Sequence, residues 1–330
     1  MSVLVTGGAG YIGSHMVLEL LGAGEDVVVL DNLSTGFRAA VAKEARLIIG
    51  DIGDSELLER VLTENSVEAV IHFAGSIIVP ESVTDPLKYY HNNTSNSRTL
   101  LAACVAHGVK HFIFSSTAAV YGMPEKNPVF EDAKLAPISP YGTSKMMTEM
   151  MLQDVSAAHD ISFSALRYFN VAGADPQGRV GQSTPEATHL IKVACQTALG
   201  ARPYMEVYGT DYPTDDGTCI RDYIHVTDLV HAHLLALVHM RENAGNMIMN
   251  CGYGRGFSVL DVIKAVEKAA GHGFDVRMAP RRAGDPAAIV AGARFVRDVL
   301  GWEPSHDDLD EIVAHAYAWE KGLITSRPAA

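Results

Sequence analysis

The chain has 330 residues and a mass of 35.4 kDa, which at about 150 residues per domain predicts two domains or one large body with an appendage. Hydrophobic residues make up 48% and charged residues 20%, so a sizeable core is expected and global disorder is excluded. The formal net charge of −13 argues against a nucleic acid or an anionic membrane as the main partner.

Targeting signals and cysteine spacing indicate the compartment. No apolar run approaches the length that crosses a bilayer, and the N-terminus has neither a basic region nor a cleavage site. The scattered cysteines form no Cys-x-x-Cys pair, which is typical of reduced thiols rather than a disulfide framework or a zinc site. A cytoplasmic protein is expected. The four residues are Cys104, Cys195, Cys219 and Cys251.

Short β-rich runs alternate with helical stretches over the first 120 residues. Near-continuous apolar strands between helices indicate a parallel sheet that is covered on both faces. This order predicts a Rossmann-like, doubly wound α/β fold. The expected strands cover 3–5, 26–30, 46–50, 69–74 and 111–115, and the expected helices cover 11–21, 55–64 and 92–107.

The sequence pattern changes after Phe169, where glycine, proline and long loops become frequent. A helix is expected over 225–239, followed by a strand over 247–250 that returns to the sheet. The last expected helix covers 308–322, and the acidic residues at its start are explained by a favourable interaction with the helix dipole. The sequence therefore predicts a first domain over 1–169, to which 225–252 returns, and a smaller C-terminal α/β domain over 170–330.

A glycine-rich turn joins the first expected strand to the first helix. Gly7, Gly10 and Gly13 permit a tight turn and a close approach to a pyrophosphate, with Tyr11 and Ile12 opening the helix. The motif follows a strand and starts a βαβ unit, which is the context that supports a dinucleotide site. An ordinary glycine-rich turn is the alternative.

An acidic residue at the end of the second strand indicates which dinucleotide is bound. Asp31 follows Gly13 by 18 residues. A carboxylate there accepts hydrogen bonds from the ribose hydroxyls and repels a 2′-phosphate, so NAD is favoured over NADP. Asp51 and Ile52, after the third strand, are expected to flank the adenine. An aspartate that only caps the following loop is the alternative for Asp31.

Tyr141 and Lys145 are four residues apart and share one face of a helix. A buried ammonium group stabilises a phenolate, which can remove a hydroxyl proton while hydride leaves for the cofactor. Spacing alone is weak evidence, because the C-terminal helix holds a second pair, Tyr317 and Lys321, which is assigned to a solvated face. The first pair follows a strand ending in the run 115–117, at the sheet edge where open α/β folds bind ligands.

Together these segments resemble the extended short-chain dehydrogenase/reductase family, and the resemblance covers nearly the whole chain. The resemblance rests on the glycine motif, Asp31-Asn32, His72-Phe73-Ala74-Gly75, Ser115-Ser116-Thr117, Tyr141-x-x-x-Lys145 and Tyr168-Phe169-Asn170. The segments that resemble the UDP-glucose 4-epimerases of that family are 208–212, 216–218, 221–226 and 282–285.

The resemblance implies an NAD-dependent isomerase that interconverts UDP-glucose and UDP-galactose through a 4-keto intermediate, with UDP-N-acetylhexosamines as further possible substrates. Tyr141 is implied as the base, Lys145 as the group that holds the nicotinamide ribose and tunes Tyr141, and Thr117 as the partner of the reacting oxygen. Domain 1–169 would bind NAD, domain 170–330 would bind the UDP-sugar, and a homodimer is expected.

Most site residues follow from this resemblance, and no metal site is expected. Asn170, Arg221, Arg282 and Asp285 are implied to hold the diphosphate and uridine, with Tyr208 stacking on uracil. The cofactor-binding set is Gly7, Gly10, Tyr11, Ile12, Gly13, Asp31, Asn32, Asp51, Ile52, Phe73, Ala74, Gly75, Asn93, Ser115, Tyr141, Lys145 and Tyr168. The substrate-binding set is Thr117, Asn170, His189, Tyr208, Arg221, Arg282, Asp285 and Ile289.

Three positions depart from the family pattern. Ile77 stands where many members have a lysine that contacts the cofactor, which bears on NAD affinity. His189 stands where an asparagine commonly meets the substrate phosphate. Ile289 stands where a bulky tyrosine often closes the sugar pocket, so that sugar specificity is open among hexose, N-acetylhexosamine and uronic acid.

Several alternatives remain at this point. A sugar-nucleotide 4,6-dehydratase commonly needs Asp-Glu after the threonine, and this chain has Ala118-Ala119, which cannot exchange protons. A UDP-glucuronate 4-epimerase or a decarboxylase would reuse most of the site. A non-catalytic NAD-sensing module would not need Tyr141, Lys145 and Thr117 together. A metalloenzyme is disfavoured because the histidines at 225, 231 and 233 lack a matched carboxylate or cysteine set.

Overall fold

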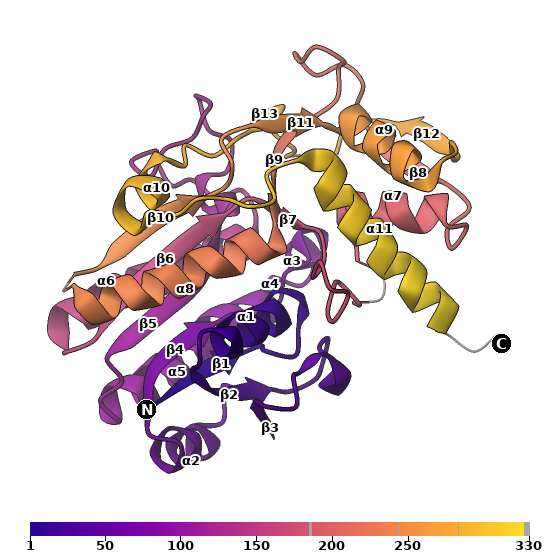
Figure 1. The fold of residues 1–330 in the computed structure, drawn as a ribbon. Helices are drawn as coiled ribbons and strands as arrows, with labels where there is room; N and C mark the ends of the chain where they lie inside the picture. The colour runs from indigo at the N-terminus through magenta and orange to yellow at the C-terminus, as the bar shows by residue number, and fades with distance from the viewer. Residues whose placement is uncertain (185–186, 244, 283, 327–330) are drawn as a thin grey trace.

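The computed structural model describes residues 1–184, 187–243, 245–282 and 284–326. A seven-stranded parallel sheet forms its centre, in the order β10-β6-β5-β4-β1-β2-β3 (Figure 1). This order confirms the doubly wound, Rossmann-like prediction. The strands are β1 Ser2–Thr6, β2 Asp26–Asp31, β3 Arg46–Ile49, β4 Val67–His72, β5 His111–Thr117, β6 Ser162–Tyr168 and β10 Met247–Cys251.

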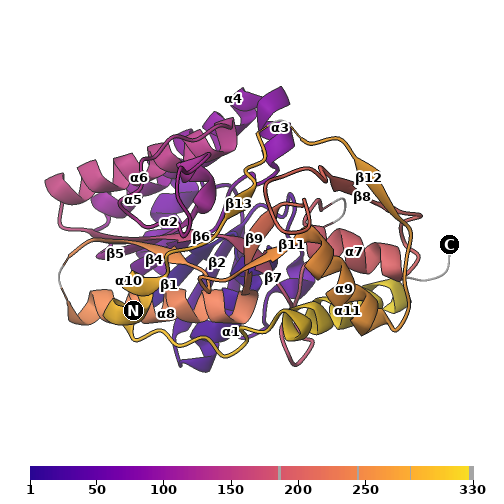
Figure 2. The same ribbon diagram turned by 90° about the horizontal axis from the view of Figure 1, so that it is seen from above.

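Helices cover both faces of the sheet. Figure 2 shows α2, α5 and α6 on one side and α1, α8 and α10 on the other. Alternate residues of β1 therefore enter two separate cores, with Val3 and Val5 in one and Leu4 in the other. The helices are α1 Tyr11–Gly22, α2 Ser55–Glu64, α3 Val79–Thr84, α4 Pro86–Tyr89, α5 Asn96–Ala106, α6 Pro140–Ala158, α8 Val226–Glu242 and α10 Arg294–Leu300.

Two small sheets lie beyond the carboxyl ends of the central strands, and the sequence did not predict them. In the first, β9 pairs with β7, β11 and β13, and in the second β8 pairs with β12. Helices α7, α9 and α11 pack beside them. These elements are β7 Asn170–Ala172, β8 Met205–Tyr208, β9 Ile220–His225, β11 Gly256–Ser258, β12 Val276–Ala279, β13 Ala288–Ile289, α7 Leu190–Ala198, α9 Val259–Ala270 and α11 Leu309–Ser326.

The segment expected to be helical over 92–107 is helical, but it begins with a π-helical turn over Tyr90–Ser95 before α5. The carbonyl of Asn93 accepts hydrogen bonds from Ser97 Oγ at 2.7 Å and from Thr148 Oγ1 at 3.1 Å. These side-chain donors tie the π-helical turn to α5 and α6. π-turns occur frequently at functional sites, and Asn93 is a candidate cofactor residue.

The acidic residues at the start of α11 make specific contacts in addition to their favourable interaction with the helix dipole. Asp308 caps the helix through its side chain, which accepts from the backbone N–H of Glu311 at 3.0 Å. Asp310 pairs with Lys268 of α9 at 2.5 Å, and Glu311 contacts His306 at 2.8 Å. Specific contacts between segments therefore account for their placement as well.

Three further expectations need correction. The Tyr317 ring is half-buried against the core, so it does not lie on a solvated face, although Lys321 is exposed. Strand β4 ends at His72, so the expected extension to residue 74 is wrong. His225 is not helical, because it ends β9 and caps α8 by accepting a hydrogen bond from Thr227 N.

The cysteines are all buried and free. Across the described ranges, none of the helices combines the length and the apolar character that crossing a bilayer requires.

Candidate active site

The N-terminus of α1 forms a cradle for an anion. Gly7 has a φ of +72°, and a Cβ there would stand 2.7 Å from Ala74 N. A Cβ on Gly13 would clash with the carbonyl of Gly7, so both positions require glycine. Within residues 1–184, no side chain caps the helix at Gly10, and no acid lies in its first turn. The first amide groups of α1 therefore remain available for a pyrophosphate, which fits NAD.

Carboxylates gather at the ends of β2 and β3, next to this cradle. Asp31 is buried and accepts from the backbone N–H groups of Ala9 at 2.9 Å and Leu33 at 2.8 Å. Asn32 Nδ2 donates to Asp51 Oδ2 at 2.8 Å. Each oxygen of Asp31 keeps lone-pair capacity for a ribose hydroxyl. Ile52 is buried and belongs to the hydrophobic core that contains Leu4.

The loop after β4 runs toward α6 and meets the π-turn. Asn93 Oδ1 accepts from Ser76 N at 2.7 Å, while Asn93 Nδ2 donates to Ser76 O at 3.0 Å and to Ser144 Oγ at 3.1 Å. A Cβ on Gly75 would stand 3.7 Å from Lys145 Nζ, which places residues 73–75 beside the predicted catalytic pair. The sequence missed Ser76 and Ser144, which carry no motif of their own.

Tyr141 and Lys145 lie buried on α6, facing the ends of β5 and β6. Lys145 Nζ donates to the carbonyl oxygen of Ser115 at 3.1 Å and lies 4.9 Å from the centre of the Phe114 ring. Ser115 Oγ donates to Tyr168 OH at 2.8 Å. The structure therefore brings Ser115, Tyr141, Lys145 and Tyr168 together at the sheet edge where they were predicted.

Burial and neighbouring groups act in opposite directions on the two titrating side chains. Burial raises the pKa of Tyr141, and a hydrogen bond with Thr117 opposes this shift. Burial lowers the pKa of Lys145 to about 8, and the carboxylate of Glu149 opposes that shift. The phenol is thus protonated in the free site, and it becomes a base only when positive charge lies close to it.

A buried ionic network lies behind the catalytic pair, and the sequence reading missed it. Glu149 Oε2 is 2.7 Å from a guanidinium nitrogen of Arg167, and Glu149 Oε1 accepts from Ser116 Oγ at 2.5 Å. Arg167 also donates to Tyr121 OH at 3.0 Å. The signal was available, because Glu149 follows Lys145 by four residues and shares its helix face.

Four of the eight candidate substrate residues lie on or beside the first small sheet. Arg221 on β9 lies opposite Ile289 on β13, and Asn170 on β7 lies opposite a neighbouring position of β9. A guanidinium nitrogen of Arg221 is 3.6 Å from Asp285 Oδ1, a pairing that the sequence did not indicate. These residues come from three distant stretches of the chain, at 170, at 221 and over 285–289.

The second small sheet positions the predicted uracil platform. Tyr208 ends β8, which pairs with β12, and the Arg282 guanidinium lies 3.7 Å from the centre of its ring. The Arg282 guanidinium thus covers one face of the Tyr208 ring.

The three departures from the family pattern occupy different surroundings. Ile77 is 49% exposed in the loop after β4. His189 Nδ1 lies 2.8 Å from Gln182 Nε2, and His189 and Asn170 both line a cavity beside α7 and α11. Ile289 is only 8% exposed and belongs to the hydrophobic core.

The three histidines considered at 225, 231 and 233 do not converge on one point. His231 Nδ1 pairs with Glu19 Oε1 at 2.8 Å, and His233 Nδ1 lies 2.8 Å from its own helix carbonyl at Leu229. His225 instead contacts His315 of α11.

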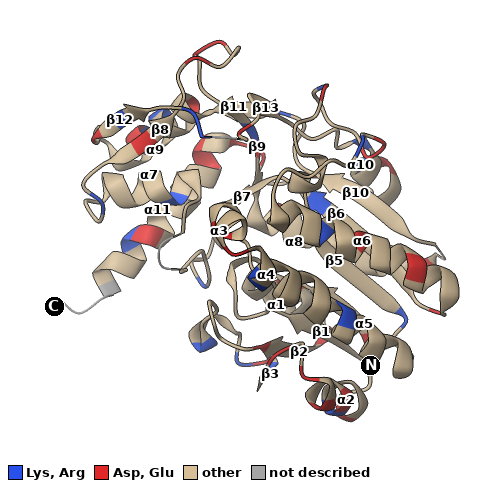
Figure 3. Cartoon of the chain, turned by 180° about the vertical axis from the view of Figure 1, so that it is seen from behind, with Lys and Arg blue, Asp and Glu red and all other residues tan. Residues whose placement is uncertain are grey.

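Figure 3 shows basic positions distributed among acidic ones along the ribbon. A diphosphate at this site would be bound by individually placed groups, such as backbone amides at a helix N-terminus.

The fold and this site define a Rossmann-type enzyme that combines a dinucleotide cradle with a tyrosine–lysine pair. The model of the NAD dependent epimerase/dehydratase family matches residues 3–252, and the chain belongs to that family.

Individual relatives cover almost the whole chain. A UDP-glucose 4-epimerase from Azospirillum brasilense is 59% identical over 98% of this chain and 93% of its own length. The structure of UDP-glucose 4-epimerase from Bifidobacterium longum in complex with NAD+ and UDP is 40% identical, covers 99% and 100% of the two chains and superposes with a TM-score of 0.94. The UDP-Glc/GlcNAc 4-epimerase from Campylobacter jejuni is 46% identical, with coverage of 97% and 99% and a TM-score of 0.86.

Proposed function

We propose that this protein is an NAD-dependent 4-epimerase that interconverts UDP-glucose and UDP-galactose. The observation that carries the proposal is the meeting of Tyr141, Lys145 and Thr117 beside the glycine cradle of α1. The direct test is incubation of the purified protein with a panel of UDP-sugars, with chromatographic separation of the products. Formation of one 4-epimer from the other supports the proposal.

In the proposed mechanism, Tyr141 and Lys145 move and hold the proton. Bound NAD supplies a reversible hydride acceptor for sugar C4. Tyr141 removes the proton from the C4 hydroxyl, Thr117 holds the reacting oxygen, and Lys145 supplies the positive charge that favours the phenolate. The 4-keto sugar then rotates within the pocket so that its other face receives the hydride, and Tyr141 returns the proton to the inverted alcohol.

The remaining candidate residues divide between the two ligands. Asp31 and the α1 amides hold the adenosine half and the pyrophosphate of NAD, and Asn93, Tyr168 and residues 73–75 line its nicotinamide half. Asn170, His189, Arg221, Arg282 and Asp285 hold the UDP group, with Tyr208 against uracil. On this division, residues 1–169 with 225–252 form the NAD domain, and 170–330 bind the UDP-sugar. The pairing of β10 with β6 supports that assignment of 225–252.

A dehydratase reaction is disfavoured by the residues after Thr117. Elimination of water needs an additional acid and base, and the positions after Thr117 are alanines. Ala119 N donates to Thr117 Oγ1 at 3.1 Å, and Ala118 is buried. Neither methyl group can exchange a proton.

The proposed reaction is redox-neutral, which gives the first prediction. The hydride that leaves C4 returns to the same sugar, so the purified protein is expected to epimerise UDP-galactose without added NAD and to accumulate little NADH. Absorbance of the reduced cofactor and product chromatography are followed together. Consumption of NAD in proportion to an oxidised sugar would instead identify a dehydrogenase.

The second prediction concerns the sugar pocket. A tyrosine in place of Ile289 would crowd an N-acetyl group at sugar C2, whereas isoleucine leaves room for it. The wild-type protein is therefore expected to prefer UDP-glucose and UDP-galactose and to show detectable turnover of UDP-N-acetylglucosamine. In Ile289→Tyr, kcat/KM for the N-acetyl sugar is expected to fall by about 10–200-fold more than that for UDP-glucose.

Val290→Tyr is the matched control, because neighbouring residues in an extended segment point to opposite sides. This variant is expected to leave the ratio of the two kcat/KM values unchanged. Equal losses on both sugars in Ile289→Tyr would show that residue 289 only packs in the core.

The proposed enzyme is a cytoplasmic homodimer. The buried free cysteines support a reducing compartment. Helices α3 and α4 pack against α6. Apolar side chains on these helices remain exposed, among them Leu87 of α4 at 77% and Met150 of α6 at 54%. Such apolar side chains on adjoining helices support contact with a second copy of the chain.

The third prediction tests this assembly by sedimentation. The wild-type protein is expected at twice the mass of the 35.4 kDa chain. The double variant Leu87→Glu/Met150→Glu is expected to sediment as a monomer, because the carboxylates would have to be desolvated at the interface. Met278→Glu, an exposed apolar position on β12, is the control and should remain dimeric. A dimer that survives the double variant would place the interface elsewhere.

A further inference from the structure

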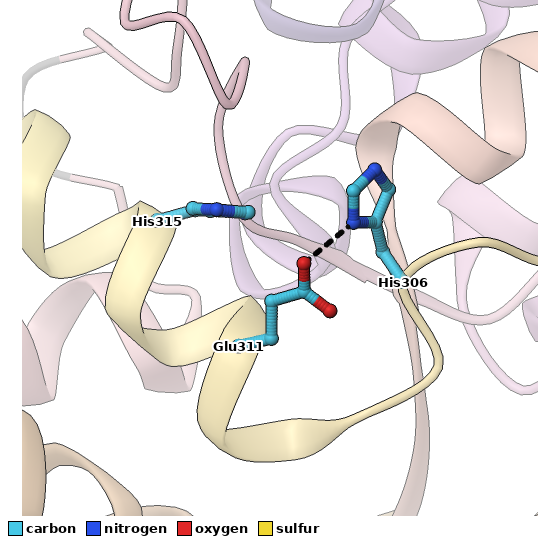
Figure 4. Close-up of side chains that lie close together, drawn as sticks. All are labelled: His306, Glu311 and His315. Atoms are coloured by element: carbon cyan, nitrogen blue, oxygen red, sulfur yellow. Dashed lines mark hydrogen bonds and ion pairs between the residues drawn. The ribbon is translucent and has the colours of Figure 1, made fainter.

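A cluster of two imidazoles and a carboxylate lies where α11 meets the segment before it. His306 precedes α11, and Glu311 and His315 lie one turn apart on it. Figure 4 shows the three side chains converging. Each offers one ligand atom, and these atoms all lie within 4.8 Å of one another. We propose that His306, Glu311 and His315 bind a divalent transition-metal ion of the zinc type.

The donor set and its dimensions suit zinc. Two imidazole nitrogens and one carboxylate oxygen form a common zinc ligand set, which leaves a fourth position for water. Tetrahedral bonds of about 2.0–2.1 Å place the ligand atoms about 3.3 Å apart. His306 Nδ1 and Glu311 Oε1 are already 2.8 Å apart, so the ion needs this pair to open slightly and His315 to draw closer. The Glu311 side chain is 40% exposed, which leaves it room to rotate.

The fold holds the ligand-bearing backbone in place. His306 N donates to Asp228 Oδ2 at 2.9 Å, and the His306 carbonyl accepts from Tyr253 OH at 3.0 Å. The cap at Asp308 fixes the first turn of α11, which carries Glu311. The ion would therefore meet ligands whose backbone is already ordered, which favours binding.

His225 is the neighbour that decides which nitrogen of His315 is free. Its ring centre lies 4.6 Å from that of His306 and 5.2 Å from that of His315. Thr227 N donates to His225 Nδ1, so neutral His225 carries its proton on Nε2 and donates it to His315 Nδ1 at 3.1 Å. An ion on His315 takes either Nε2, whose proton must then shift to Nδ1, or Nδ1, which breaks the hydrogen bond from His225 without moving a proton.

Burial favours the neutral, metal-binding form of the two neighbouring imidazoles His225 and His315. It lowers the pKa of His225 to about 2 and also lowers the pKa of His315, with further lowering by His306. Glu311 and Asp175 act in the opposite direction on His315, and Asp175 is itself paired with Arg179.

Binding at this position would stabilise one wall of the candidate substrate cavity. Trp319 and Glu320, further along α11, line the cavity with Asn170 and His189. An ion that joins α11 to residue 306 would hold this wall against the β9–α8 junction, where His225 lies. We expect the melting temperature to rise with Zn2+ concentration, because the ligands are assembled only in the folded chain.

The test uses untagged, chelator-treated protein titrated with Zn2+ by calorimetry and with Co2+ by visible absorption. Wild type is expected to bind one ion per chain and to give the intense band of tetrahedral Co2+. Glu311→Gln and His315→Ala are each expected to raise the Zn2+ Kd by more than about 100-fold, beyond the usual cost of losing an outer-shell partner. His272→Ala removes an exposed histidine outside the cluster and should leave the Kd unchanged.

Circular dichroism and retained NAD show whether each variant is folded, and Glu311→Gln preserves the shape of a partly exposed side chain. The proposal is supported if both ligand variants lose the ion and the rise in melting temperature. It is overturned if wild type shows no saturable binding, or if the folded Glu311→Gln protein binds Zn2+ as tightly as wild type.

Discussion

The variant Tyr141→Phe is expected to epimerise UDP-galactose about 10²–10⁴-fold more slowly than wild type while keeping its NAD. The substitution removes only the hydroxyl group, so α6 stays packed against β5 and β6. The glycine cradle of α1 and Asp31 still bind the dinucleotide. The measurements are turnover by product chromatography and NAD content after denaturation.

Tyr89→Phe is the matched control for this loss. Tyr89 is buried and its ring centre lies 6.5 Å from that of Tyr141, while its hydroxyl donates to the carbonyl of Ile78. It is expected to turn over at a rate close to that of wild type. Near-normal turnover by Tyr141→Phe would assign the base to another group and would contradict the proposed mechanism.

The central sheet and the NAD cradle were predictable because their signals are local. Gly7, Gly10 and Gly13 lie within seven consecutive residues at the junction of β1 and α1. The strand before them has an uninterrupted apolar run. The choice of glycine follows from the structure, since a Cβ at Gly7 would enter the backbone at Ala74. The periodicity of apolar residues and the local spacing of glycines were therefore sufficient to predict the central sheet and the glycine cradle.

The two small sheets and the buried networks depended on pairings between distant segments. Strand β13 contains two residues and cannot show a period, yet its pairing with β9 places Ile289 beside Arg221. His225 and His315 are 90 residues apart and meet only through tertiary packing. The UDP-sugar residues were named by resemblance, and no local rule indicated the contact between Arg221 and Asp285.

Glu149 shows how a local signal can be present and still be missed. Its spacing from Lys145 matches that between Tyr141 and Lys145, but a helical glutamate is usually solvated. Its burial is explained by its ion pair with Arg167 on β6. Arg167 lies in a different element, so the sequence did not show that the two residues meet. The consequence for catalysis is testable.

Glu149→Gln is expected to shift the alkaline limb of the pH–rate profile to lower pH. Burial lowers the pKa of Lys145 to about 8, and the Glu149 charge opposes this shift. Without that charge the Lys145 pKa falls further, so Lys145 loses its proton, and its support of the Tyr141 phenolate, at a lower pH. Removal of a negative charge also favours the Tyr141 phenolate, so the pKa that governs the acidic limb should not rise. A role confined to packing would lower activity without moving either limb.

The same variant is expected to lower the free energy of unfolding by about 3–5 kcal/mol, because Arg167 stays charged and buried without its partner. The double variant Glu149→Gln/Arg167→Met separates the two effects, since it removes the unpaired charge. Denaturant unfolding should show much of the stability restored. Loss of the Arg167 charge itself acts to raise the Lys145 pKa, so the charge effect is measured in Glu149→Gln alone. If that variant loses stability and activity while its alkaline limb keeps the wild-type position, Glu149 acts on Lys145 only by holding the fold together, and its charge does not tune the catalytic pair.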